Sequence, residues 1–179
     1  PTEGTVITHE VPQMEDVVVS GATVQKNMAK ISLVGVENRP GNAAKIFSSL
    51  AKAKVVVNDI MQTEVSAQKA NLSFTVSVSD LEAAKEAVET LRDEVNFERL
   101  FVRDDIAEVT VVGVGMRTHY GVAEKMFSSL AKAQVNIDSI TTSEIRISCI
   151  VDEAQAEKAL ETVCLAFELD KPAEQRSKV

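Results

Sequence analysis

Two short loops carry the residues best suited to bind a small charged molecule. Each has a glycine, Gly41 or Gly121, directly before a stretch with the apolar spacing of a helix. A helix start presents unpaired backbone N–H groups and the positive end of the helix dipole, so it attracts a carboxylate. Glycine has no Cβ, which lets a ligand approach the backbone. The loops therefore supply half of a binding site, although Pro40-Gly41 is equally an ordinary turn.

Polar residues follow each loop, in segments expected to form strands. Residues 58–62 read Asn-Asp-Ile-Met-Gln, and residues 136–144 contain two acids, Asp138 and Glu144, that could pair with an ammonium group. Thr142 and Ser143 could add hydroxyl hydrogen bonds. Together with the helix starts, these groups suit a zwitterion, that is, a free amino acid. Acidic residues at strand ends are also commonly solvated without binding a ligand, so this pattern allows a binding site but does not require one.

The same groups do not form a catalytic constellation. We find no nucleophile beside a base and no glycine-rich phosphate loop of the G-x-x-x-x-G-K-[ST] type. Cys149 and Cys164 lack metal-ligand spacing, and His9 and His119 do not complete a cluster. We expect both cysteines to be buried, reduced thiols, and we expect no cofactor and no metal. The residues alone predict a binding module and not an enzyme.

The elements that position these loops occur twice. Residues 47–53, Phe-Ser-Ser-Leu-Ala-Lys-Ala, return unchanged at 127–133. Gly113 follows Gly35 by 78 positions and Gly121 follows Gly41 by 80, so the second copy has two extra loop residues. A repeat of this kind predicts two similar structural units.

The first unit is predicted as βαββαβ from its periodicities. We expect strands at 30–36, 54–64, 71–78 and 97–102, with helices from Pro40 to about Ala53 and from Ser79-Asp80 to Arg92. The second unit repeats the order with strands at 108–114, 135–142 and 145–151 and helices at 121–133 and 153–166, and then lacks its last strand. This order is typical of the ferredoxin-like α+β fold, an antiparallel sheet with two helices on one face.

An unclaimed strand precedes the first unit, and it is the natural replacement for the missing one. The first unit would then be inserted into the second. We predict a linker or tail at 1–16, a strand at 17–25 that completes the second unit, the first unit at 28–104, the second at 105–170 and a C-terminal tail at 171–179. The first residue is Pro1, not Met, which suggests a fragment or a processed subunit.

Composition excludes two classes of partner. The net charge is −8 and the pI about 4.9, which disfavours a nucleic-acid surface, because phosphates require a basic patch. No apolar run approaches the ~20 residues that span a membrane, and no secretory signal is visible. We expect a cytoplasmic protein that binds neither nucleic acid nor membrane. Units of this size have marginal cores, so we also expect them to pack on a partner.

Several stretches resemble a known family. The run from Val112 to Ala123 and the run from Asn136 to Ser148, with its Thr-Ser-Glu-Ile-Arg-Ile-Ser segment, look like the second ACT domain of aspartate kinases. Residues 35–47 resemble their first ACT domain, and residues 166–170 their C-terminal end. The resemblance implies two ACT domains that form the regulatory part of an aspartate kinase, or its separate regulatory beta subunit, for which Met14 could mark an internal start.

Members of that family phosphorylate the side chain of aspartate with ATP, as ATP:L-aspartate 4-phosphotransferases. Their ACT pair gives feedback inhibition by threonine, lysine or both. The resemblance implies a chain without catalysis of its own, an aspartate kinase catalytic domain or subunit as partner, and a homodimer through the ACT domains with effectors between units. It assigns effector binding to Asn38, Gly41, Ala43, Ala44, Asn58, Asp59, Ile60 and Gln62, and to Met116, Val122, Asn136, Ile137, Asp138, Thr142, Ser143 and Glu144.

Two departures from the family pattern keep a second function open. Many relatives have an acid where Asn38 stands, and residues 63–69 differ from their usual Gln-Asn-Val pattern. The alternative is a dimerisation scaffold for the kinase that binds no effector.

Overall fold

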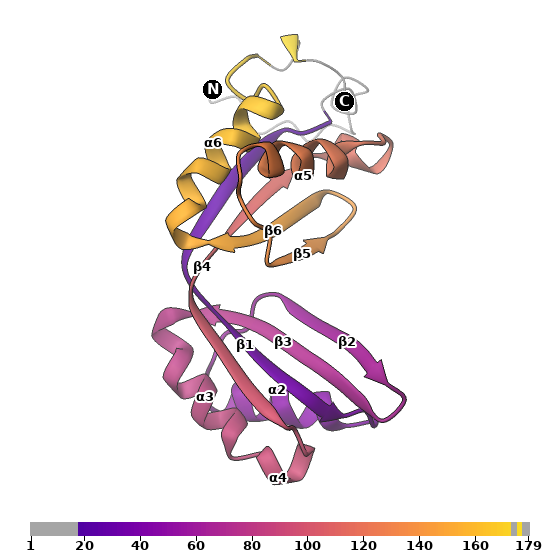
Figure 1. Cartoon of the computed structure of the whole chain (residues 1–179), viewed down its shortest axis with the longest axis vertical. Coiled ribbons are helices and arrows are strands. Elements are labelled where there is room, and N and C mark those ends of the chain that lie inside the picture. The colour runs from indigo at the N-terminus through magenta and orange to yellow at the C-terminus, as the bar shows by residue number, and fades with distance from the viewer. Residues whose placement is uncertain (1–17, 173–174, 177–179) are drawn as a thin grey trace, which may run out of the picture. The chain divides into compact units, whose positions relative to one another are not determined.

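The chain folds as two units, and one is inserted into the other (Figure 1). The computed structural model describes residues 18–172 and 175–176. The first unit is Gln25–Ala107, and the second combines the residues up to Val24 with those from Glu108 onward. The α+β fold and the insertion are therefore confirmed. The predicted linker at 1–16 and most of the predicted tail at 171–179 lie outside the described residues.

The first unit contains a four-stranded antiparallel sheet in the order β2-β3-β1-β4. Its elements are β1 (Gly21–Glu37), α2 (Asn42–Lys52), β2 (Ile60–Ser66), β3 (Lys69–Ser77), a 3-10 turn η1 (Val78–Asp80), α3 (Leu81–Glu89), α4 (Arg92–Val95) and β4 (Arg99–Val112). Helices α2 and α3 pack together on one face of the sheet. Ile46 and Leu50 from α2 meet Ile31 of β1 and Phe74 of β3 in a fully buried core.

The second unit repeats this arrangement with the order β1-β4-β6-β5. After β4 come η2 (Val114–Arg117), α5 (Val122–Lys132), β5 (Ser139–Thr142), β6 (Arg146–Asp152), η3 (Glu153–Gln155) and α6 (Ala156–Ala166). Helices α5 and α6 pack together. Met126 and Leu130 occupy the positions of Ile46 and Leu50, and both are fully buried.

The N-terminal segment fills the place that the second unit leaves empty. The N–H of Ser20 donates to Val112 O at 2.8 Å, just as the N–H of Glu98 donates to Val34 O at 2.9 Å in the first unit. Val112 follows Val34 by the same 78 positions as the sequence repeat. Arg176 also binds this segment, since its Nη1 donates to Val19 O at 3.2 Å. Strand completion by the N-terminal residues is thus confirmed in detail.

Two pairs of predicted strands are in fact single strands. The segments at 17–25 and 30–36 are joined in β1, whose described strand residues begin at Gly21, and those at 97–102 and 108–114 are joined in β4. The joining residues are not loop-like, because Met28, Ala29, Ile106 and Ala107 are fully buried. The sequence predicts a connection at these positions, whereas the chain continues as strand, with a left-handed residue, Asn27 at φ 57°, inside β1.

Several predicted boundaries were also wrong. Helix α2 begins at Asn42 and not at Pro40, because Gly41 has φ 96°, in the left-handed region. Strands β2 and β5 begin several residues later than predicted, at Ile60 and Ser139, and β3 ends at Ser77. Val55, ahead of β2, is buried in the apolar core. A short run of buried apolar residues has the same sequence pattern as a buried strand, which is why the strand was predicted to begin too early. The predicted helix to Arg92 ends at Glu89, and α4 follows as a separate turn.

Candidate functional site

The loop between β1 and α2 borders a cavity of about 330 Å³ in the first unit. Gly41 ends this loop, and a Cβ built there would meet no heavy atom within 4 Å, so the backbone faces open space. The N–H of Lys45 donates to Gly41 O at 3.0 Å and the N–H of Asn42 to Arg39 O at 3.4 Å. The N–H groups of Ala43 and Ala44 lie in the first turn of the helix, where no intrahelical acceptor is in reach. The lining residues are Val36, Glu37, Asn38, Arg39, Pro40, Gly41, Asn42, Ala43, Ile46, Gln62, Ala70 and Leu72.

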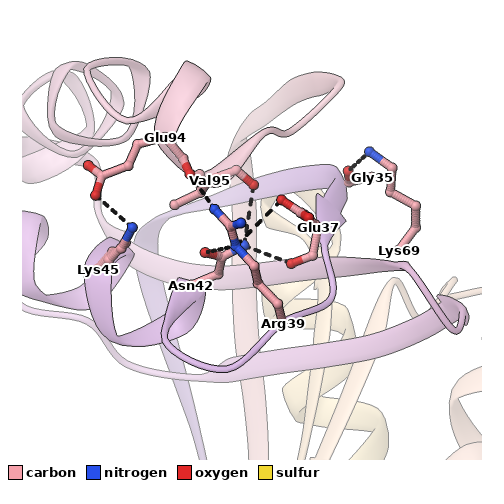
Figure 2. A network of polar contacts seen from close by, with 8 residues as sticks. All are labelled: Gly35, Glu37, Arg39, Asn42, Lys45, Lys69, Glu94 and Val95. Carbon is pink, nitrogen blue, oxygen red and sulfur yellow. Dashed lines mark hydrogen bonds and ion pairs between the residues drawn. The ribbon is translucent and has the colours of Figure 1, made fainter.

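Asn42 holds the loop in place, and it is not among the site residues predicted from the sequence. The residue is 3% exposed, and its Nδ2 donates to Glu37 O at 2.8 Å and, less closely, to Val95 O at 3.5 Å (Figure 2). A buried amide without partners would destabilise the fold by roughly 1–3 kcal/mol, so these bonds are required. The one signal in the sequence is a polar residue directly after the glycine of a helix start.

Arg39 brings a positive charge to the same loop. Its Nε lies 3.5 Å from Glu37 Oε2 and donates to Asn42 Oδ1 at 3.4 Å, while its Nη2 donates to Glu94 O at 3.2 Å (Figure 2). The cavity therefore has a carboxylate and a guanidinium among its walls. Both side chains are partly exposed, so a ligand can reach them through solvent.

A second ion pair lies on the α4 side of this network. Lys45 Nζ is 2.7 Å from Glu94 Oε1. The hydrogen bond from Lys45 lowers the pKa of the Glu94 carboxyl from its ordinary value, and the positive charge of Lys45 acts in the same direction. Glu94 is therefore ionised throughout the neutral range.

The cavity gathers four of the eight first-unit residues that the resemblance assigned. Asn38, Gly41, Ala43 and Gln62 line it. Ala44 points elsewhere, into a separate hollow with Lys45, Ser48 and Glu94.

The other three assigned residues lie at the start of the edge strand, outside the cavity lining. The N–H of Asn58 donates to Thr75 O at 2.9 Å, the N–H of Asp59 to Thr75 Oγ1 at 3.1 Å, and Ile60 pairs with Phe74. These backbone bonds fix the entry into β2.

The equivalent loop of the second unit has a different construction. Gly121 again has positive φ, 90°, but Val122 stands where Asn42 stands and is buried as an apolar residue. The two extra residues are accommodated around η2, where Thr118 Oγ1 donates to Gly115 O at 3.2 Å. Met116, in η2, is half-buried. This loop is therefore held by bonds among its own residues, from backbone N–H groups and from the Thr118 hydroxyl, and not by a buried amide.

The remaining second-unit residues cluster at the two ends of β5. Asn136 and Asp138 are exposed and Ile137 is half-buried, and Ser139 Oγ donates to Asp138 Oδ2 at 3.1 Å. At the other end Thr142 is exposed, and the N–H of Ser143 donates to Arg146 O at 2.8 Å. Glu144 Oε2 lies 3.2 Å from Arg117 Nε, which brings the β5–β6 turn to the η2 loop.

Within residues 18–172 and 175–176, no group of three or more His, Cys, Asp or Glu side chains is arranged to hold a metal ion. A search of the helices in this part of the chain found none with the length and apolarity needed to cross a membrane.

Comparisons with known proteins agree with the repeat. A family model described as ACT domain matches twice, at residues 31–91 and 109–167. The chain is 40% identical over 176 residues to the aspartokinase of Helicobacter pylori. The aligned region covers 94% of this chain and 42% of that protein. The chain thus spans less than half the length of this curated relative.

Solved structures give the same result. The ligand-free regulatory subunit of aspartate kinase from Thermus thermophilus has TM-score 0.77 and 38% identity, covering 84% of this chain and 99% of that one. A structure of aspartokinase alpha and beta subunits has TM-score 0.78 and 36% identity, with the same coverage.

These matches define a protein with two ACT domains. The chain belongs to the ACT domain family, as a tandem pair of the kind that forms the regulatory region or regulatory subunit of aspartate kinase.

Proposed function

We propose that this chain is the allosteric amino-acid sensor of an aspartate kinase, which binds threonine, lysine or both and gives feedback inhibition. The observation that carries the proposal is the first-unit cavity beside the Gly41 helix start. Its volume is within the range of small-molecule sites. Its walls offer a helix N-terminus and Arg39 for a ligand carboxylate, with Glu37 for an ammonium group.

In this proposal the assigned residues form two sets, one that lines the first-unit cavity and one in the second unit. Asn38, Gly41, Ala43 and Gln62 contact the effector directly in the first unit. The second-unit set around Asp138 and Glu144 forms a separate site between η2 and β5. The wider expectations are also part of the proposal: an aspartate kinase catalytic domain or subunit as partner, a homodimer through the ACT domains and a cytoplasmic location.

The alternative is a dimerisation scaffold that binds no effector. The two edge strands favour it, because β2 exposes Ile60 and Val65 and β5 exposes Ile140. Exposed apolar edge strands are suited to pairing with another chain. An edge strand does not explain a cavity lined by opposite charges, so we place this function second.

A thermal-shift screen of the common amino acids, singly and in pairs, tests the proposal. A ligand that binds only the folded chain raises its melting temperature. We expect a shift with threonine or lysine, and calorimetry should then give saturable heat. No shift and no heat with any amino acid would favour the scaffold.

A pair of variants locates the binding. Ala43 lines the cavity and is half-buried, so Ala43→Leu should fill it and remove the heat of the first site. Ser48→Leu makes a comparable apolar change at an exposed position of the same helix, outside the lining. Equal heats from both variants would exclude the cavity as the site.

A further inference from the structure

We propose that Asn42 is a positioning residue that couples the occupied first-unit cavity to α4. This inference rests on the function proposed above. We use the name Asn42 bridge for the bonds from Asn42 Nδ2 to Glu37 O and Val95 O. The bridge spans two segments far apart in sequence, since Glu37 is 5 residues from Asn42 and Val95 is 53.

The bridge does not act alone. Arg39 Nη2 donates to Glu94 O at 3.2 Å, and Lys45 Nζ contacts the Glu94 carboxylate at 2.7 Å (Figure 2). The loop and the first turn of α2 thus hold α4 at two consecutive residues. Neither Glu94 nor Val95 lines the cavity, whereas Arg39 and Asn42 do. A ligand that shifts the loop must therefore move or break contacts to a segment that it does not touch.

The second unit shows that Asn42 is not needed to start a helix. Gly121 has φ 90° and the N–H of Lys125 donates to Gly121 O at 2.8 Å, against φ 96° and 3.0 Å for Gly41 and Lys45. The helix starts match although Val122 replaces Asn42. The amide therefore has a role beyond the helix, and its only described hydrogen bonds run to the loop and to α4.

Asn42→Asp separates the bridge from the helix. The substitution keeps the shape of the side chain but sets a carboxylate oxygen against two carbonyl oxygens, which repel it. A negative charge in the first turn of a helix is favourable, so α2 itself should persist. Asn42→Val copies the second unit and provides a second variant if the aspartate prevents folding.

Hydrogen exchange of the whole chain, followed by mass spectrometry, measures the coupling. The reporters in α4 are the N–H groups of Glu94 and Val95, which donate to Leu91 O at 3.0 and 2.9 Å. Without ligand, Asn42→Asp should speed exchange in residues 92–97 about tenfold, the size expected for losing one net hydrogen bond. Residues 69–77 of β3 should be unchanged. Ala51→Asp adds the same charge at an exposed position of α2 that lines neither the cavity nor the hollow beside Glu94, so it should leave the exchange of residues 92–97 as in wild type.

The ligand arm uses saturating L-threonine and L-lysine, separately. In wild type we expect slower exchange in residues 37–42 and also in residues 92–97. In Asn42→Asp only the loop should respond. Two results would overturn the coupling. One is that ligand slows exchange of residues 92–97 in Asn42→Asp as much as in wild type, and the other is that ligand binds wild type without changing exchange in those residues. If neither amino acid binds wild type, the proposed function fails, and the ligand-free arm alone decides whether Asn42 positions α4: unchanged exchange there refutes it.

Discussion

Lys45 Nζ and Glu94 Oε1 are 2.7 Å apart, and this contact joins the first turn of α2 to α4. Both side chains are about half-exposed, so the contact is a surface ion pair. Such pairs are sensitive to pH and salt. It is therefore a convenient reporter of how α4 is held.

Glu94→Gln should lower the melting temperature slightly near neutral pH. The pKa of Glu94 is lowered in the folded chain by the Lys45 hydrogen bond, so this contribution to stability is present above the ordinary carboxyl pKa. It is lost as the pH falls through the lowered pKa, and the variant and wild type should then melt together. Thermal melts across acid pH check this, with Glu86→Gln on α3 as control. A melting temperature of Glu94→Gln that stays below that of wild type in strong acid would contradict this role of the Glu94 carboxylate.

Gly113→Ala should be among the most damaging single substitutions in the second unit. A Cβ there would lie 2.0 Å from Val18 O, and backbone cannot move aside as a side chain can. We expect a loss of about 3 kcal/mol in the free energy of unfolding. Gly41→Ala meets no atom and carries only the cost of positive φ, about 1–2 kcal/mol. Denaturant unfolding of both variants compares them, and an equal loss would count against the Val18 contact.

Cys149 should resist thiol reagents in the folded chain. Burial, with the Glu108 carboxylate, raises its pKa from 9.0 to about 12, so roughly a thousandfold less thiolate is present. Cys164 is only half-buried, although burial raises its pKa as well. We expect slow labelling of Cys164 first, faster as the pH rises, and labelling of Cys149 only after unfolding. Cys164→Ser isolates the buried thiol, and rapid labelling of that variant would refute the prediction.

Asp138→Ala should weaken effector binding in the second unit while leaving the fold intact. The side chain is exposed, and the backbone N–H that donates to Ile150 O at 2.8 Å is kept. We expect a change below about 0.5 kcal/mol in unfolding free energy. Calorimetry with threonine and lysine measures binding, and denaturant unfolding measures stability. Global unfolding of the variant would remove Asp138 from the proposed site.

The repeat made the architecture predictable. Ile46 and Leu50, with their counterparts Met126 and Leu130, follow helical spacing and form the two buried cores. The strand missing from the second unit was also inferable, because one unit had a strand too few and the chain one too many. Counting elements in a duplicated sequence settles topology when local signals are ambiguous.

Local periodicity could not predict where strands continue or where the loop is anchored. Residues near Met28 and Ile106 gave no strand pattern, and only pairing with distant neighbours makes them extended. The role of Asn42 depends on Val95, which lies 53 positions away. An amide that is buried by tertiary structure looks the same in sequence as one in a solvated turn.

The insertion also sets an order of events during synthesis. Residues 25–107 form the first unit, with the ends of β1 and β4 continuing beyond it, and can fold as soon as they leave the ribosome. The segment before them has to wait for its partner, since Ser20 pairs with Val112, 92 residues later. Closing so long a loop is entropically costly and slow. The second unit is therefore expected to form last, with its edge beside β4 unpaired until the N-terminal segment docks.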